Sequence, residues 1–264
     1  MSITAHCIVK NEEHFVGYAL RSVLPSVEKV IVFDTGSTDA TCAVIRGIAA
    51  EFPGKVVFEE KGPCGKARHT ELRQEMLDRT ATDWWMIVDG DEVWTKRAID
   101  EARAASTGTA ADCLFAPFHL CVGDIFHEYR RRGAYEVLGR RGNYALRFMR
   151  RIPGVRWDGA YGEDALKDAS GSIFSTEKNS LFLKNAFWHL THLTRSSADD
   201  LDYSSGGSRA MKRRLTYFLI GKRIAEPLPE VFSGEGRRMR ISPFRSFVSF
   251  FRLILFKMHF ISHA

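Results

Sequence analysis

The fold of this chain is decided by the stretch Val27-Glu28-Lys29-Val30-Ile31-Val32-Phe33-Asp34-Thr35-Gly36-Ser37-Thr38-Asp39. Its first part is rich in β-branched and apolar residues, which predicts a strand over Val27–Phe33. Gly36 permits a tight turn, and the hydroxyl and carboxylate side chains beside it can cap a helix. Apolar residues then recur at helical spacing over Asp39–Phe52, so the stretch predicts a strand, a turn and a helix in succession.

The same alternation continues on both sides of this stretch. Strands are predicted over Ile3–Val9, Val56–Phe58 and Trp85–Val88, and helices over His14–Val23, Lys66–Arg79 and Thr95–Arg103. This alternation implies an α/β fold with a doubly wound, mostly parallel sheet. Ligands bind beyond the carboxyl ends of the strands in such sheets. Asn11, Asp34 and Asp89 each follow a predicted strand, so we expect them on one rim.

The middle of the chain is less regular. Further strands are predicted over Cys113–His119 and Tyr144–Arg150, with a loop or hairpin over Tyr129–Gly142 between them. Phe182–Leu193 is predicted to be a strand or an extended segment. The arginines at 130–132 and 140–141 could hold an anionic acceptor, although such runs are commonly just solvated.

Composition excludes several classes of protein. An aromatic content of 12% is too high for a disordered chain of 264 residues. Five cysteines, an odd number without a CxxC pair, argue against a disulfide framework and a structural zinc site. No apolar run is long enough to span a bilayer, and the first residues resemble a strand rather than a signal peptide. We therefore expect a cytoplasmic protein.

Positive charge is concentrated at the C-terminus. Residues 205–264 contain 12 Lys and Arg against 3 Asp and Glu, whereas the whole chain carries a net charge of only +6. We therefore predict a main domain over 1–204, a loop or linker at Ser204–Ser208, and a basic helical extension over 205–264. Helical patterns cover Arg209–Lys222 and Pro243–Ile261.

The second of these patterns is amphipathic. Arg245, Ser249 and Arg252 line one narrow face, and Phe and aliphatic residues occupy the rest. Such a helix suits peripheral contact with the inner face of the cell membrane. Docking on the domain or on a dimer partner is the alternative. A basic tail also attracts nucleic acid, but the apolar content favours lipid, so we expect no nucleic-acid partner.

Three carboxylates are crowded together in Asp89-Gly90-Asp91-Glu92, directly after an apolar strand. Carboxylates in this number repel one another unless a cation neutralises them, and oxygen ligands suit Mg²⁺ or Mn²⁺. The alternative is the acidic first turn of the following helix. Asp34 is similarly open to two interpretations: it could bind a base or a ribose, or it could belong to a capped turn without a ligand.

Three segments together closely resemble family 2 glycosyltransferases of the GT-A fold: Cys7-Ile8-Val9-Lys10-Asn11-Glu12, Ile31–Thr41 and Trp85–Glu92. The resemblance is clear over residues 1–120 and weaker to about 200. It implies a nucleotide-sugar donor, a divalent cation and inverting transfer to a hydroxyl. By this resemblance Asp34 contacts the base, Asp89 lies by the ribose and diphosphate, and Asp91 ligates the metal together with Asp89.

The resemblance also suggests residues further along the chain. The segment Gly62–His69 opens a helix with Lys66 and Arg68, which makes an anion site suited to a diphosphate; an ordinary solvated basic turn is the alternative. Glu163 is the first candidate for the base that deprotonates the acceptor, Asp164 the second and Asp158 the third; a solvated pair opening a helix is the alternative. Late histidines often join the metal or diphosphate in this family, and His189 or His192 could do so, but not both from one strand. A histidine with satisfied hydrogen bonds in the core or on the surface is the more common role for each.

These observations predict a metal-dependent inverting glycosyltransferase that uses a UDP-linked sugar. The expected acceptor is a glycan or a lipid-linked saccharide, as in envelope polysaccharide synthesis. The alternative is a degenerate GT-A domain that binds or scaffolds without turnover. The intact Asp89 and Asp91 pair argues against that alternative.

Overall fold

Four parallel strands form the N-terminal half of the central sheet. The computed structural model describes residues 1–129, 136–200 and 221–234. Within them β1 (Ile3–Val9), β2 (Lys29–Asp34), β3 (Val56–Glu60) and β4 (Trp84–Ile87) lie in the order β3-β2-β1-β4. All three pairings are parallel. The strand order reverses at β1, which creates a switch point for ligand binding between the ends of β1 and β4.

Antiparallel strands extend the sheet beyond β4. They are β10 (Tyr144–Arg150), β6 (Cys113–Val122), β7 (Asp124–Tyr129) and β15 (Gly221–Arg223), in that order. Two short strands, β13 (Ser180–Phe182) and β14 (Phe187–His189), pair with β6, and β14 also pairs with β5 (Glu92–Val93). The last pairing brings the Asp89–Glu92 segment next to a strand almost a hundred residues further along the chain.

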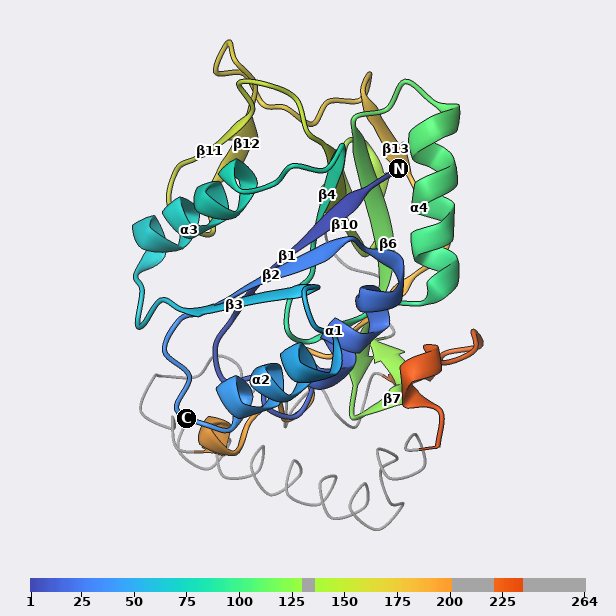
Figure 1. The fold of residues 1–264 in the computed structure, drawn as a ribbon. Helices are drawn as coiled ribbons and strands as arrows, with labels where there is room; N and C mark the ends of the chain where they lie inside the picture. Colours follow the sequence, from blue (N-terminus) through green and yellow to red (C-terminus); the bar gives the residue numbers. More distant parts are fainter. Residues whose placement is uncertain (130–135, 201–220, 235–264) are drawn as a thin grey trace, which may run out of the picture.

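Helices cover both faces of the sheet (Figure 1). One face packs against α1 (Val16–Val23), α2 (Thr41–Glu51) and α4 (Lys96–Gly108), and the other against α3 (Lys66–Asp78) and the hairpin β11 (Arg156–Asp158) and β12 (Ala165–Lys167). The alternation of strand side chains explains this. Ala5, Cys7 and Met86 face α1 and α4, whereas Ile8 and Trp85 face the opposite side.

The remaining elements of the described residues are short. They are three 3₁₀ turns, Leu24–Ser26, Ser197–Asp200 and Glu230–Phe232, and the hairpin β8 (Glu136–Val137) and β9 (Arg140–Arg141). Within the described part of 129–142, the predicted hairpin is therefore confirmed.

Most predicted elements are found, and two need correction. The bounds predicted for β1 and β10 are confirmed to the residue. The strand or extended segment predicted over Phe182–Leu193 contains the last residue of β13 and the whole of β14. It is interrupted because the backbone N–H groups of Lys184 and Asn185 leave the ladder and donate to the Glu101 carboxylate, each over 2.9 Å.

The helix predicted over Arg209–Lys222 is wrong at its end, where residues 221–223 form β15 and pair with β7. Residues 209–220, the linker at 204–208 and the helix predicted over 243–261 lie outside the described residues. The division at 204 therefore stays a prediction, while β15 joins part of the predicted extension to the main sheet.

Candidate active site

The carboxyl ends of β1 and β2 are tied together at one rim. The Asn11 backbone N–H donates to Ser37 Oγ over 2.9 Å, and Asn11 Oδ1 accepts from the Thr38 backbone N–H over 2.8 Å. Asn11 has a φ of 54°, in the left-handed region that Asn tolerates better than most residues. The predicted placement of Asn11 next to the loop after Asp34 is therefore confirmed.

Asp34 shapes this loop from within. Its Oδ1 accepts the backbone N–H groups of Gly36 and Ser37 over 2.9 and 3.0 Å, and its Oδ2 accepts the Ser37 hydroxyl. The residue is only 2% exposed. The geometry is that of a capped turn, so contact between Asp34 and a nucleotide base stays a prediction.

Arg147 of β10 holds two carboxylates of the acidic motif. Its Nη2 lies 3.1 Å from Asp89 Oδ2 and 2.6 Å from Glu92 Oε1, and its Nε donates to Glu92 Oε2 over 3.0 Å. The Asp89 side chain is 41% exposed, whereas that of Glu92 is fully buried. Burial raises the pKa of Glu92, Asp89 and Asp91 add to the effect, and Arg147 opposes it. Arg147 thus supplies part of the positive charge that the crowded carboxylates need.

The interpretation of this motif as the first turn of a helix is wrong. Helix α4 begins at Lys96 and is capped by Thr95, whose Oγ1 accepts the Ala98 backbone N–H over 3.2 Å. Asp89 and Asp91 belong instead to the turn between β4 and β5, and Glu92 is the first residue of β5.

Asp91 lies between an imidazole and a guanidinium. Its Oδ1 is 3.6 Å from His189 Nε2 and its Oδ2 is 3.4 Å from Arg195 Nη1. Arg195 also binds Glu12 Oε1, so one arginine neutralises two carboxylates. Burial lowers the pKa of His189, although the charges of Asp91 and Asp89 oppose this effect. The lowered pKa favours the neutral imidazole, which is the form that binds metals.

Asp89, Asp91 and His189 are the residues that could hold a divalent cation. Carboxylate oxygens suit Mg²⁺ and Mn²⁺, and His189 Nε2 lies 3.6 Å from Asp91 Oδ1. Within residues 1–129, 136–200 and 221–234, no group of three His, Cys, Asp or Glu is assembled around one point. Mg²⁺ sites commonly consist of one or two carboxylates completed by substrate phosphates, and this arrangement has that form.

The basic residues of α3 face two directions. The helix begins at Lys66 as predicted, but Lys66 and Arg68 are exposed, and Arg68 Nη1 pairs with Glu71 over 2.8 Å. Arg73 instead lines a pocket together with Asp89. Sequence reasoning missed Arg73, although its spacing of four residues from His69 places both on one helix face.

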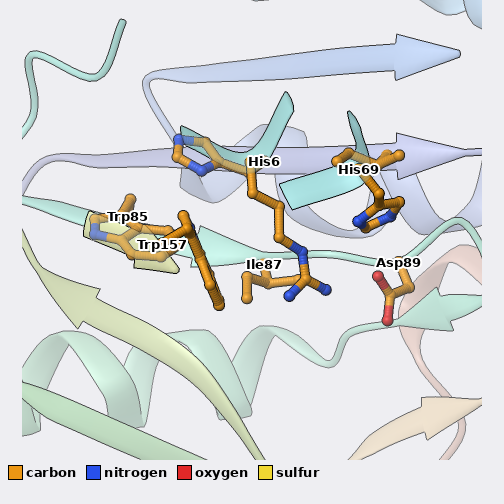
Figure 2. A pocket seen from close by; sticks show the side chains of 8 residues that line it. His6, His69, Trp85, Ile87, Asp89 and Trp157 are labelled. Carbon is orange, nitrogen blue, oxygen red and sulfur yellow. The ribbon is translucent and has the colours of Figure 1, made fainter. Parts of the chain in front are cut away.

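Figure 2 shows the side chains that line this pocket, with Asp89 and His69 at one end and Trp85 at the other. It is lined by residues of β1, β4, α3 and β11, namely His6, Ile8, Trp85, Ile87, Asp89, His69, Arg73 and Trp157. A volume of about 20 Å³ leaves room for a water molecule but not for a sugar. His69 Nδ1, Trp85 Nε1 and Trp157 Nε1 are buried without a hydrogen-bond partner. A polar occupant would form hydrogen bonds with these atoms, and buried polar atoms without hydrogen bonds destabilise the fold.

Of the predicted base residues, Glu163 and Asp164 lie in the turn between β11 and β12, not at the start of a helix, and Asp158 is the last residue of β11. Asp164 Oδ2 accepts from Arg73 Nη1 over 2.6 Å, and its side chain is 5% exposed. Glu163 is exposed. Asp158 pairs with Lys167 over 2.5 Å, and this contact lowers the pKa of Asp158. Asp164 is therefore connected to the pocket through Arg73, whereas Asp158 is engaged on the surface.

A segment near residue 195 closes one side of the rim, and sequence reasoning did not find it. The Arg195 carbonyl accepts the His14 backbone N–H over 3.0 Å, and the Ser197 N–H donates to Glu13 Oε1 over 2.6 Å. Hydrogen bonds from Ser197 and Ala40 lower the pKa of Glu13 to about 2. The contact spans 184 positions of sequence, and no local pattern signals it.

The predicted membrane contact involves a segment outside the described residues. Residues 243–261 are not among the described residues, and no described helix is both long and apolar enough to cross a bilayer. His189, on β14, lies beside Asp91, and His192 follows the strand.

Comparison with known sequences assigns most of the chain. Residues 5–191 match the model of glycosyl transferase family 2. The chain is 25% identical over 134 residues to the SPbeta prophage-derived glycosyltransferase SunS of Bacillus subtilis (strain 168), and equally to glycosyltransferase SunS of Bacillus phage SPbeta. These alignments cover 49% of this chain and 30% of each relative, so the chain spans about a third of their length.

Comparison with solved structures concerns the fold alone. Residues 1–349 of S. aureus TarS match with a TM-score of 0.50 at 15% identity, over 76% of this chain and 62% of that chain. A second TarS structure also gives 0.50 at 14% identity, over 81% of this chain and 42% of that one. The expected GT-A architecture is thereby confirmed. With its family match over residues 5–191, the chain belongs to glycosyl transferase family 2.

Proposed function

We propose that this chain transfers a sugar from a nucleotide-sugar donor to a hydroxyl group, with inversion and with a divalent cation. The donor is UDP-linked, and the acceptor is a glycan or a lipid-linked saccharide of envelope polysaccharide synthesis. The proposal rests above all on the Asp89-Gly90-Asp91 turn, which ends β4 beside the loops that follow β1 and β2. Acidic residues at such a switch point, flanked by Arg147 and Arg73, suit a nucleoside diphosphate and its cation.

The donor would lie across the rim. The loops at Asn11 and Asp34 would receive the nucleoside, and Lys66 and Arg68 in the first turn of α3 would attract the diphosphate. Asp89, Asp91 and His189 would hold Mg²⁺ or Mn²⁺. When bound, the cation neutralises charge on the leaving diphosphate.

Inverting transfer needs a base on the acceptor side. The acceptor oxygen attacks the anomeric carbon, the bond from that carbon to the diphosphate oxygen breaks, and the hydroxyl proton passes to a carboxylate. We assign this carboxylate to Glu163 first and to Asp164 second. The Asp164 carboxylate is engaged by Arg73 and its side chain is 5% exposed, whereas Glu163 is exposed to an incoming hydroxyl.

One observation favours the second candidate, a domain that binds without turnover. Arg195 already neutralises Asp91 and Glu12, so the acidic site is partly compensated without any cation. Such a domain would bind nucleotide yet fail to consume a nucleotide sugar.

The decisive experiment measures thermal stability with UDP, GDP, CDP and ADP, each with Mn²⁺, with Mg²⁺ and with EDTA. A ligand at a hundred times its dissociation constant stabilises the native state by about 2.7 kcal/mol. We expect UDP to raise the melting temperature only with a cation, and Asp91→Asn to abolish the shift. Asp100→Asn, on an exposed site of α4, should leave it intact.

Consumption of UDP-sugars then separates the two candidates. UDP release in the presence of an acceptor mixture supports the enzyme, whereas nucleotide binding without release supports the domain without turnover. If no nucleotide shifts the melting temperature under any condition, both are wrong.

A further inference from the structure

A second, larger cavity opens on the same face of the sheet as the pocket beside Asp89. Its volume is about 460 Å³, within the range of roughly 300–1,000 Å³ typical of small-ligand sites. It lies where β6, β10, β13 and the hairpin β8–β9 meet, and it is lined by Pro117, Arg140, Tyr144 and residues 180–184. Phe182 at this cavity and Ile87 at the smaller pocket belong to one apolar cluster, which places both on one face.

The aromatic wall of this cavity is fixed by its neighbours. The Phe182 ring stacks on Phe115 with centroids 5.1 Å apart, and Tyr144 meets it edge-on at 5.0 Å. The guanidinium of Arg140 lies 4.5 Å from the centroid of the Phe182 ring. Because these side chains are already ordered, a ligand that packs against them loses little affinity to ordering.

The charged groups of the cavity are all positive. Arg140 and Lys184 line it, and no Asp or Glu does. Neither side chain forms an ion pair among the described residues, whereas the neighbouring Arg141 pairs with Glu136 over 3.3 Å. A cavity with two unneutralised cations and an aromatic wall attracts an anion that also has an apolar surface.

The cavity lies on the strand next to β4, which ends at the acidic turn of Asp89 and Asp91. Tyr144 lies on β10 three positions before Arg147, and Arg147 contacts Asp89 over 3.1 Å. The β10 strand itself is paired with β4, which ends at the acidic turn. The cavity and the acidic turn therefore lie on neighbouring strands, β10 and β4.

We propose that this cavity is the acceptor subsite and that it binds an anionic saccharide, one that carries a carboxylate or a phosphate. The proposal rests on the proposed glycosyltransferase function. It makes Arg140 and Lys184 the residues that select the acceptor by charge, separately from the residues that hold the donor.

The test measures the binding of three probes by ligand-observed NMR. The probes are 4-nitrophenyl β-D-glucuronide, glucose 6-phosphate and the neutral methyl β-D-glucoside. We expect at least one anion to bind about tenfold more tightly than the neutral glucoside, since a charge-assisted contact is lost with the latter. Whichever anion binds identifies the acceptor charge as carboxylate or phosphate. The double variant Arg140→Glu/Lys184→Glu should weaken that binding by about tenfold or more.

The control is Arg141→Glu, on the same strand with 86% of its side chain exposed and outside the cavity. It should leave anion binding unchanged. The double variant should keep the melting-temperature shift by UDP and Mn²⁺, so failure of the donor site is measured separately. Equal binding of the neutral probe, no binding of either anion, or equal weakening by Arg141→Glu would overturn the proposal.

Discussion

Gly90 separates the two aspartates of the acidic turn because a side chain does not fit there. A Cβ atom at this position would lie 2.9 Å from both Glu12 Cγ and Val9 Cγ1. Contacts this short force neighbouring atoms to move, and overpacking of this kind costs about 1–3 kcal/mol. We expect Gly90→Ala to lower the free energy of unfolding by that amount in urea denaturation, and to displace Glu12 from Arg195.

Gly47 provides the matched comparison. It lies within α2, and a Cβ atom there would meet nothing within 4 Å. Gly47→Ala should stabilise the protein by about 0.5–1 kcal/mol, since Ala loses less entropy in a helix. Equal free energies of unfolding for Gly90→Ala and the unmodified protein would show that the turn accommodates a methyl group at position 90.

His6 makes stability depend on pH. Its Nε2 lies 2.7 Å from the Thr80 hydroxyl, its ring stacks on Trp85, and burial lowers its pKa to about 3. Above pH 6.5 the imidazole is neutral in both states, and its contribution is fully present. As the pH falls from 6.5 towards 3, His6 is protonated in the unfolded chain but stays neutral in the folded chain. Stability should then fall by about 1.4 kcal/mol per pH unit.

The measurement is urea denaturation at several pH values between 4 and 7, on the order of half a unit apart. His6→Gln should flatten the decline below pH 6.5, while His14→Gln, at a side chain that is 46% exposed, should not. An unchanged slope in His6→Gln would assign the acid sensitivity to other groups.

At the level of elements, the hairpin β11–β12 carries the candidate bases and is anchored to α3. The Tyr161 backbone N–H donates to the Lys66 carbonyl over 3.1 Å, and Asp164 pairs with Arg73. We expect Glu163→Gln to keep UDP binding and lose transfer by about 10²-fold, the scale of general-base catalysis. Asp164→Asn should instead loosen Arg73 and destabilise the hairpin. An active Glu163→Gln with an inactive, folded Asp164→Asn would exchange the two roles.

Local elements were predictable because their signals are local. The apolar runs of β1 and β10 define their bounds, and the start of α3 at Lys66 follows from the glycines before it. The direction of Arg73 was not predictable in the same way, because the partners that hold it, Trp157 and Asp164, lie some ninety residues further along the chain.

At the scale of the whole molecule, residues from distant parts of the sequence complete the site. Asp91 follows β4, yet its partners Arg195 and His189 come from about a hundred residues later. The three motifs at Asn11, Asp34 and Asp89 predicted the rim because parallel strands bring their own ends together. Nothing in the sequence near Arg195 indicates that it binds Glu12 and Asp91, since the pairing of β14 with β5 and β6 and the hydrogen bonds to His14 and Glu13 bring it there.

The C-terminal segment adds a property that the sheet does not explain. Its charge and its Phe-rich pattern, over Pro243–Ile261, are features of the sequence alone. A Phe or Leu side chain removed from water contributes about 1.5–3 kcal/mol, and each nearby basic residue adds about 1 kcal/mol on an anionic surface. Arg245, Arg252 and Lys257 interrupt the apolar run, which makes a spanning helix costly but suits a helix in the interface.

We therefore predict that the full chain co-sediments with anionic liposomes at low salt but not with neutral phosphatidylcholine liposomes. Truncation near Ile241 should leave the protein in the supernatant and spare turnover on a water-soluble acceptor analogue, because the described site residues all precede the cut. Phe247→Asp/Phe251→Asp in the full chain should act like truncation, since each carboxylate replaces an apolar anchor and is repelled by anionic lipid. If the full chain stays in the supernatant at low salt, the segment packs on protein instead. A monomer after truncation, from a dimeric full chain, would then identify it as a dimer interface.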